Sequence, residues 1–259
     1  MRIVYSKTGS TGNCSVIESS SGGKIIIDCG LKYDKVNRKV GYTLHKASAV
    51  LVTHCHGDHT AHLKDFFKTN VNILMNAETL AQAQKQGHIK ALTSKSKVKV
   101  LSYKNQYEYG DFIVKPFPLK HTSYVVNEET GIKEELPCDC SGFLIFEKAT
   151  KEKLLWITDT SYVESTFPPM DYICIECNYF EQENYADEIQ YINEFVEKRR
   201  LKSHLSFETC KEFLNLQNLS KCKEIRLLHL SSTMQQEDKE KVAKMLRNEL
   251  YTKNIEVKL

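Results

Sequence analysis

One short stretch of the chain, residues 53–60, constrains its fold and chemistry more than any other. It reads Thr-His-Cys-His-Gly-Asp-His-Thr and holds three histidines and one aspartate within six residues. The apolar run before it, residues 47–52, is typical of a buried strand, and residues 61–68 favour the first turns of a helix. The stretch is therefore predicted to be a strand-to-helix loop that turns several side chains inward.

Imidazole nitrogens and carboxylate oxygens are ligands that zinc, manganese and iron accept. His54 and His56 are two residues apart, so in extended backbone they point the same way. Asp58 and His59 follow Gly57, where the chain can turn and aim them at a second point. The spacing indicates two metal ions side by side, and a histidine-rich surface loop is the less favoured alternative.

The pattern His-x-His-x-Asp-His after a strand resembles the signature of the metallo-β-lactamase superfamily of hydrolases. The resemblance implies an α/β fold, a four-layer αββα sandwich with the metals at one edge of its two sheets. Residues 9–14, Gly-Ser-Thr-Gly-Asn-Cys, and residues 28–30, Asp-Cys-Gly, resemble the opening of its WalJ/YycJ-like branch, whose members are regarded as nuclease-like. An ordinary glycine-rich turn would look similar.

The resemblance assigns seven side chains to two divalent metal ions, either zinc or manganese, with iron as a third option. They are His54, His56 and His121 for the first ion, Asp58, His59 and His229 for the second, and Asp159 bridging both. By itself, a lone histidine such as His121 would more often be structural, and Asp159 would be a turn residue or a helix cap. In register with the other motifs, both are expected to be ligands.

The resemblance also implies catalytic roles. A hydroxide that bridges the two ions is the expected nucleophile, and Asp58 is expected to act in catalysis as well as in binding. His204 is expected to touch the scissile phosphate and protonate the leaving oxygen, because an imidazole can exchange a proton near neutral pH. The alternative is a histidine packed under the following helix, and the branch carries glycine where this chain has Ser203. Asn178, in Glu176-x-Asn178, is expected to contact substrate, or else only closes a strand.

The leading interpretation is a metal-dependent phosphodiesterase or nuclease, an exonuclease included, that acts on nucleic acid or a nucleotide. An aspartate at position 58, with no cysteine ligand, is typical of phosphodiesterases and glyoxalases in the superfamily. A cyclic-nucleotide phosphodiesterase would need a small closed pocket, and a thioesterase or lactonase would need an apolar one. A non-catalytic binding module should have lost ligands, and none is lost.

The bulk composition sets wide limits. The 259 residues carry a net charge of +3, which neither requires nor excludes a nucleic-acid partner. No apolar run of about eighteen residues exists, so no membrane partner is expected. The nine cysteines have no disulfide-like spacing and predict reduced thiols in a cytoplasmic protein, rather than a structural zinc site. A single domain over residues 1–259 is predicted, and a homodimer is an open expectation without a motif to support it.

Periodicity and turn residues predict the remaining elements. Helices are expected over residues 31–44, 77–85, 187–200, 207–216 and 235–250, and Ser206 is a candidate N-cap. Strands are expected at residues 3–5, 14–18, 24–28, 71–75, 98–101, 111–119, 141–146, 154–158, 171–178, 224–228 and 254–258. The polar segment 122–136 reads as a loop or hairpin beside the site and is a candidate for contact with substrate.

Overall fold

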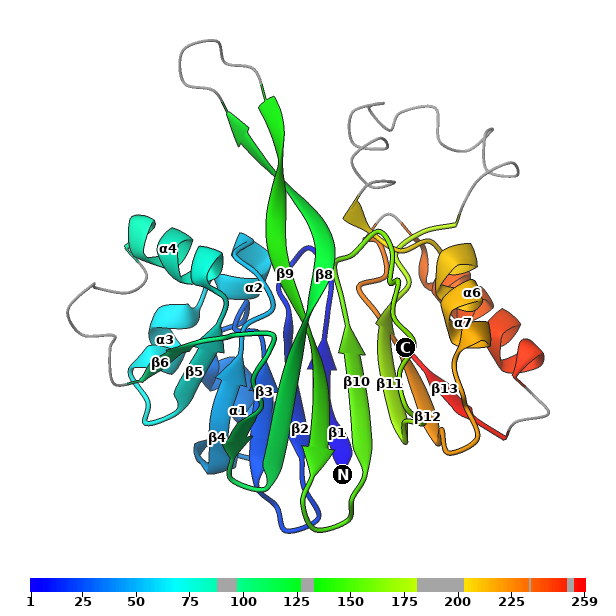
Figure 1. Cartoon of the computed structure of the whole chain (residues 1–259), viewed down its shortest axis with the longest axis horizontal. Coiled ribbons are helices and arrows are strands. Elements are labelled where there is room, and N and C mark those ends of the chain that lie inside the picture. Colours follow the sequence, from blue (N-terminus) through cyan, green and yellow to red (C-terminus); the bar gives the residue numbers. More distant parts are fainter. Residues whose placement is uncertain (88–96, 127–132, 181–202, 233, 251–253) are drawn as a thin grey trace. The chain divides into compact units, whose positions relative to one another are not determined.

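The computed structural model describes residues 1–87, 97–126, 133–180, 203–232, 234–250 and 254–259. The chain divides into two compact units. The first unit comprises Met1–Pro118 and Asp139–Leu154, and the second comprises Leu119–Cys138 and Leu155–Leu259. The strands form one sheet of six and one of seven, with helices between them in the sequence, so the predicted α/β class is confirmed (Figure 1). The single domain over residues 1–259 stays a prediction.

The six-stranded sheet belongs to the first unit, and its strands lie in sequence order. They are β1 (Arg2–Lys7), β2 (Cys14–Glu18), β3 (Lys24–Ile27), β4 (Ala47–Leu51), β5 (Asn72–Met75) and β6 (Val98–Val100). β1, β2 and β3 pair antiparallel, whereas β3 to β6 pair parallel. Because β3 and β4 are parallel neighbours, the residues after their carboxyl ends meet at one edge. There the Asp28 amide donates to the Leu51 carbonyl (2.8 Å).

Helices cover one face of this sheet. The helical segments of the first unit are α1 (Tyr33–Lys39), a 3-10 turn (Leu44–Lys46), α2 (Gly57–Thr60), α3 (Leu63–Phe67) and α4 (Ala77–Lys85). Val36, Phe66 and Ala83 from three of these helices share one core cluster with Val50 and Ile73 from the sheet. The strand residues in this cluster follow the two-residue period of a strand. The burial therefore fixes the register of β4, on which the histidine-rich loop depends.

Two predicted helix boundaries in the first unit are wrong. The helix expected over residues 31–44 stops at Lys39, because Gly41 and Tyr42 adopt the left-handed backbone region (φ 65° and 60°) and cannot continue a right-handed helix. The helix expected to begin at Ala61 begins instead at Gly57 and is followed by a second one, α3. The earlier start places Asp58 and His59 inside a helical turn rather than in a loop.

The second sheet has seven strands in the order β13-β12-β11-β10-β9-β8-β7. They are β7 (Tyr107–Tyr109), β8 (Phe112–Val126), β9 (Lys133–Glu147), β10 (Lys153–Ile157), β11 (Tyr172–Glu176), β12 (Glu224–Leu228) and β13 (Glu256–Lys258). β11, β12 and β13 pair parallel. The segment 122–136, expected to be a loop or hairpin, contains the ends of two long neighbouring strands, β8 and β9, which agrees with the hairpin alternative (Figure 1).

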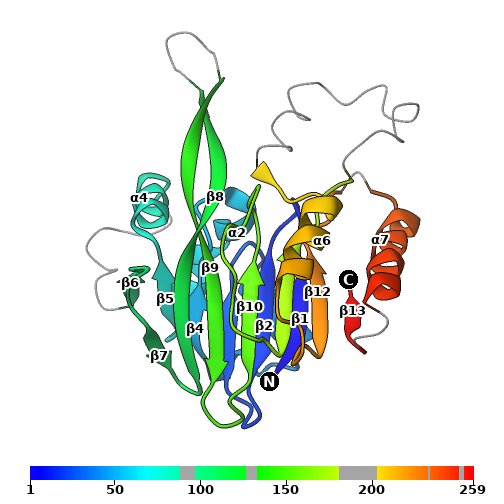
Figure 2. The same cartoon turned by 45° about the vertical axis from the view of Figure 1, so that its right-hand side comes forward.

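Among its described residues, the second unit has two long helices, α6 (Phe207–Leu216) and α7 (Gln236–Glu249), and α7 runs beside β13 (Figure 2). The Arg247 guanidinium donates to the Val257 carbonyl (2.9 and 3.1 Å), which ties α7 to that strand. The predicted cap of α6 is confirmed, because the Ser206 hydroxyl accepts from the Thr209 amide (3.0 Å). The helix expected over residues 187–200 lies outside the described residues. Among the described helices, none is both long and apolar enough to cross a membrane.

Candidate metal centre

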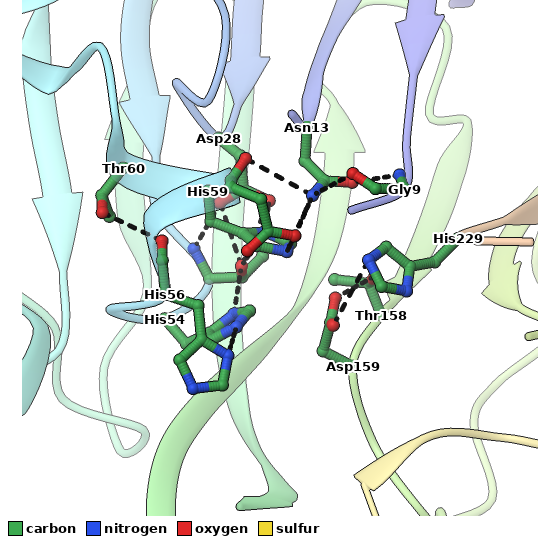
Figure 3. Close-up of polar contacts among 12 residues, drawn as sticks. Gly9, Asn13, Asp28, His54, His56, His59, Thr60, Thr158, Asp159 and His229 are labelled. Atoms are coloured by element: carbon green, nitrogen blue, oxygen red, sulfur yellow. Dashed lines mark hydrogen bonds and ion pairs between the residues drawn. The ribbon is translucent and has the colours of Figure 1, made fainter. Parts of the chain in front are cut away.

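The loop after β4 places two of the predicted ligands face to face. His54 is fully buried, and its Nε2 lies 2.9 Å from Nδ1 of the half-buried His56. The two rings meet edge to face with centroids 4.5 Å apart (Figure 3). Nδ1 of His54 lies 3.0 Å from the Thr53 hydroxyl. Two ring nitrogens that face each other cannot both carry a proton, so at least one of them presents a lone pair.

A buried carboxylate sets the tautomer of His59. Oδ2 of Asp28 lies 2.8 Å from Nδ1 of His59, and its Oδ1 accepts from the backbone amide (2.8 Å) and hydroxyl (2.9 Å) of Thr53. Because an ionised carboxylate only accepts, Nδ1 of His59 carries the proton and Nε2 keeps its lone pair. A carboxylate behind a histidine is the arrangement that orients metal-binding imidazoles. Sequence reasoning quoted Asp28 only as part of a turn motif and missed this role.

The glycine-rich turn after β1 is attached to the α2 turn that carries Asp58. The Asn13 amide donates to the Asp58 carbonyl (2.7 Å), and the Gly30 amide donates to the Asn13 carbonyl (2.8 Å). The side-chain nitrogen of Asn13 lies 2.9 Å from Oδ2 of Asp58. The same nitrogen lies 2.9 Å from Nε2 of His59 (Figure 3). The two glycine motifs therefore build one support for Asp58 and His59.

In the second unit, Asp159 and His229 lie side by side. Asp159 follows β10, and its Oδ2 accepts from the Thr158 hydroxyl (2.7 Å). Its Oδ1 lies 3.6 Å from Nε2 of His229, which follows β12 directly (Figure 3). Both residues are nearly inaccessible to solvent, at 2 % and 5 % exposed. The two strands thus bring a carboxylate and an imidazole to the same buried point.

Glu176, at the end of β11, joins the histidines of this unit. It is fully buried, and its Oε1 lies 2.6 Å from Nδ1 of His204 and 3.1 Å from Nδ1 of His229. Its Oε2 accepts from the amides of Thr160 (3.0 Å) and Leu205 (3.3 Å). Burial alone would raise the pKa of Glu176, but the neighbouring His204 and the hydrogen bonds outweigh burial and lower it. Glu176 is therefore ionised, and both Nδ1 atoms carry protons.

His204 packs against the same cluster. Its ring stacks on that of His229 (centroids 5.1 Å apart, 22° between planes), and its Nδ1 lies 3.7 Å from Oδ1 of Asp159. The alternative of a histidine packed under the following helix does not describe this arrangement, because His204 contacts the groups at the strand ends. Sequence reasoning noted Glu176 only beside Asn178, and nothing in the sequence indicated its contact with His204.

His121 and Asn178 are the remaining predicted site residues in the second unit. His121 lies inside β8 rather than at a strand end, and its Nδ1 donates to the Ser203 carbonyl (3.0 Å). Its ring centroid is 5.6 Å from that of His204. The side-chain nitrogen of Asn178 donates to the His229 carbonyl (2.7 Å). Contact of Asn178 with substrate stays a prediction, and in the structure its amide supports His229.

The donors fit divalent metal ions. In the first unit the structure groups His54, His56, Asp58 and His59; in the second it groups His121, Asp159, His204 and His229, with Asn178 behind. Asp159, Glu176, His204 and His229 place one ligand atom each within 4.8 Å of one another. Neutral imidazoles and carboxylates are what zinc, manganese and iron accept, and the choice among these metals stays a prediction.

The sequence profile of the beta-lactamase superfamily domain matches residues 24–218, more than half of the chain. The chain therefore belongs to the beta-lactamase superfamily. The crystal structure of the metallo-beta-lactamase fold protein YhfI from Bacillus subtilis has a TM-score of 0.63 at 17 % identity, covering 99 % of this chain and 93 % of that one. Unliganded yeast PDE1 has a TM-score of 0.68 at 13 % identity, covering 98 % and 96 %. These likenesses confirm the predicted metallo-β-lactamase fold.

Two curated relatives match parts of the sequence. Ribonuclease Z from Methanopyrus kandleri is 32 % identical over 106 residues, which cover 39 % of this chain and 37 % of that protein. The anti-Pycsar protein Apyc1 from Bacillus phage 010DV004 is 32 % identical over 62 residues, 24 % of each chain. The matched segments span well under half the length of either relative.

Proposed function

We propose that this protein is a phosphodiesterase that uses two divalent metal ions to cleave phosphodiester bonds in nucleic acid or a nucleotide. The observation that carries the proposal is the shared tautomer of three buried histidines. Nδ1 of His59 is held by Asp28, Nδ1 of His229 by Glu176, and Nδ1 of His121 by a backbone carbonyl. Each ring therefore keeps its lone pair on Nε2, which is what a metal ion requires of histidine.

The assignment of ligands follows the superfamily motifs in chain order. The first ion takes His54, His56 and His121; the second takes Asp58, His59 and His229; Asp159 serves both. When bound, two such ions acidify a water and stabilise the charge that develops on a phosphate. The protein's own part is to orient the donors through Asp28 and Glu176, so that little reorganisation accompanies the reaction.

His204 is the proposed proton donor to the leaving oxygen. Nδ1 of His204 donates to the ionised Glu176 carboxylate, and this hydrogen bond fixes the orientation of the other ring nitrogen. Burial of Glu176 strengthens this pairing, because few waters compete for the carboxylate. The aspartate at position 58 is proposed to act in catalysis as a ligand of the second ion.

The substrate class rests on the relatives and on the donor set. A curated relative named ribonuclease Z shares 32 % identity with part of this chain, which supports nucleic acid as substrate. The support that residues 9–14 and 28–30 give to Asp58 is consistent with the WalJ/YycJ-like branch, and we propose membership of that branch. The homodimer and the cytoplasmic location remain predictions.

An activity screen tests the proposal. Protein loaded with zinc or with manganese is assayed on single- and double-stranded DNA and RNA, on cyclic nucleotides, and on thioester and lactone panels. Turnover of phosphodiesters with either metal, abolished by chelation and restored by metal, is the expected result. Turnover of thioesters or lactones with no cleavage of any phosphodiester would refute it, and turnover of cyclic nucleotides alone would replace nucleic acid with the small-nucleotide alternative.

A variant tests His204. His204→Ala should retain both metal ions but lower kcat on a nucleic-acid substrate by about 100- to 10,000-fold, the usual contribution of general acid catalysis. On a p-nitrophenyl phosphodiester the loss should be much smaller, because p-nitrophenolate leaves without a proton. His62→Ala, at a partly exposed histidine just after α2, is the matched control. Equal losses on both substrates would exclude the proton-donor role.

A further inference from the structure

We infer that Asn13 is a positioning residue for the second metal ion, because its side-chain amide orients both Asp58 and His59. This inference rests on the proposed function, and it concerns a residue outside the seven ligands. Asn13 lies in the turn between β1 and β2, is 2 % exposed, and belongs to the same unit as the two residues that it contacts. The whole contact is therefore within one compact unit.

The orientation of the Asn13 amide group is set by the backbone of Gly9. Oδ1 of Asn13 accepts from the Gly9 amide (2.7 Å), and Nδ2 lies 3.1 Å from the Gly9 carbonyl. The Gly9 amide can only donate, so the atom that faces it must be the side-chain oxygen. The nitrogen is thus the atom that faces the ligands. Gly9 adopts a φ of 123°, a conformation that side chains rarely permit, which explains a glycine there.

The Asn13 nitrogen reaches both candidate ligand atoms at once. Nδ2 lies 2.9 Å from Oδ2 of Asp58 and 2.9 Å from Nε2 of His59. Because Nδ1 of His59 carries the ring proton and donates it to Asp28, Nε2 is an acceptor and its contact with the Asn13 amide is a true hydrogen bond. The amide has only two hydrogens, and the Gly9 and Asp58 carbonyls also lie within 3.4 Å of the nitrogen. The hydrogens are therefore shared among more acceptors than they can satisfy.

This shared bonding has a consequence for metal affinity. The amide keeps the Asp58 carboxylate turned toward His59, which lowers the cost of organising the pair when an ion binds. A metal ion that binds Nε2 of His59 displaces the Asn13 amide from that lone pair. The amide then donates to the Asp58 carboxylate alone. Backbone bonds from Asn13 to Asp58 (2.7 Å) and from Gly30 to Asn13 (2.8 Å) hold the turn in place throughout. Asn13 therefore affects the second ion, and the first ion, assigned to His54 and His56, should be unaffected.

Metal binding tests the inference without an activity assay. Zinc and manganese are titrated into metal-free protein against a chromophoric chelator, so that the two ions are resolved by their dissociation constants. Asn13→Ala should weaken the second ion by about 10- to 100-fold, the usual effect of removing a group that orients a metal ligand. The first ion should bind as in the wild type. Thr11→Ala, an exposed change in the same turn, is the matched control.

A second variant separates positioning from general support of the fold. Asn13→Asp keeps the acceptor for the Gly9 amide but replaces the donor with an oxygen beside Asp58. Repulsion between the two carboxylates should lower the thermal stability of the metal-free protein, whereas a cation relieves it. The second ion should therefore bind Asn13→Asp at least as tightly as the wild type, although this variant is less stable.

Three results would overturn the inference. One is an unchanged second affinity in Asn13→Ala. The second is a loss of both ions together in that variant. The third is a loss of affinity in both variants that merely follows their loss of stability. A wild-type protein that binds fewer than two ions would instead refute the proposed function itself, so the two failures are distinguishable.

Discussion

Replacing Gly30 with alanine should displace the backbone that supports Asp58 in the candidate metal centre. A Cβ at Gly30 would lie 1.7 Å from the carbonyl oxygen of Asp58 and 2.7 Å from the backbone nitrogen of Asn13. Both neighbours are backbone atoms and cannot rotate away, so one or both segments must move. The Gly30→Ala variant should therefore fold with lower stability and with Asp58 displaced.

The expected loss of stability follows from the contacts that the added Cβ would disrupt. Three backbone hydrogen bonds join these segments: Asn13 to Asp58, Gly30 to Asn13, and Cys29 to His59 (2.7, 2.8 and 2.9 Å). Overpacking a tight site costs about 1–3 kcal/mol. A lost hydrogen bond costs about 1 kcal/mol. If one or two of these bonds break, the free energy of unfolding should fall by about 2–5 kcal/mol, a large part of the about 5–15 kcal/mol typical of a domain.

Urea unfolding followed by far-UV circular dichroism measures the change. Gly57→Ala is the matched control, because a Cβ at Gly57, the residue before Asp58, meets nothing within 4 Å. The control should stay within about 0.5 kcal/mol of the wild type, as surface substitutions usually do. If the Gly30→Ala and Gly57→Ala variants are equally stable, the loop that contains Gly30 can move to accommodate a Cβ at little cost. That result would refute the claim that this loop supports Asp58 rigidly.

Two further predictions concern other parts of the chain. Ser206→Ala should lower the free energy of unfolding by about 1 kcal/mol, because it removes the hydroxyl that accepts from the Thr209 amide; Ser206→Asp should restore it, and urea unfolding of both variants provides the check. The hydroxyls of Ser19 and Ser21 (2.6 and 2.5 Å) lower the pKa of Asp111 in the folded protein, so its stabilisation is present above about pH 4 and is lost as pH falls through the folded-state pKa. Asp111→Asn should therefore cost about 1 kcal/mol at pH 7 and progressively less in acid, and thermal melts from pH 7 to pH 2 that keep a constant difference would contradict this.

The strands that precede the candidate ligands were predictable because their short apolar runs indicate burial. The run before His54 and the run before Asp159 are apolar and short, and each appears as the predicted strand, β4 and β10. The buried strand residues alternate between two faces, so the pattern also determines which side chains emerge at the strand end. The positions of these candidate ligands at strand ends could therefore be predicted from the local pattern of apolar and polar residues.

The groups behind the ligands were not predictable, because they act through contacts between distant residues. Asp28 reaches His59 across 31 positions, and Glu176 reaches His229 across 53. The residues next to a carboxylate at a strand end do not indicate whether it will be buried and orient a histidine or will be an ordinary turn residue.

The backbone at the candidate ligands provides a further reason to regard these strand ends as functional. Asp28, Asp159 and His229 each adopt a left-handed conformation (φ 62°, 49° and 51°) at or just beyond the end of a strand. Such residues cost about 1–3 kcal/mol and persist only where surrounding contacts hold them. The contacts are present in each case: Thr53 holds Asp28, the Thr158 hydroxyl holds Asp159, and the Asn178 amide holds His229. The backbone therefore turns sharply, under the hold of these contacts, at two predicted ligands of the second unit, Asp159 and His229, and at Asp28, the support of His59 that sequence reasoning missed.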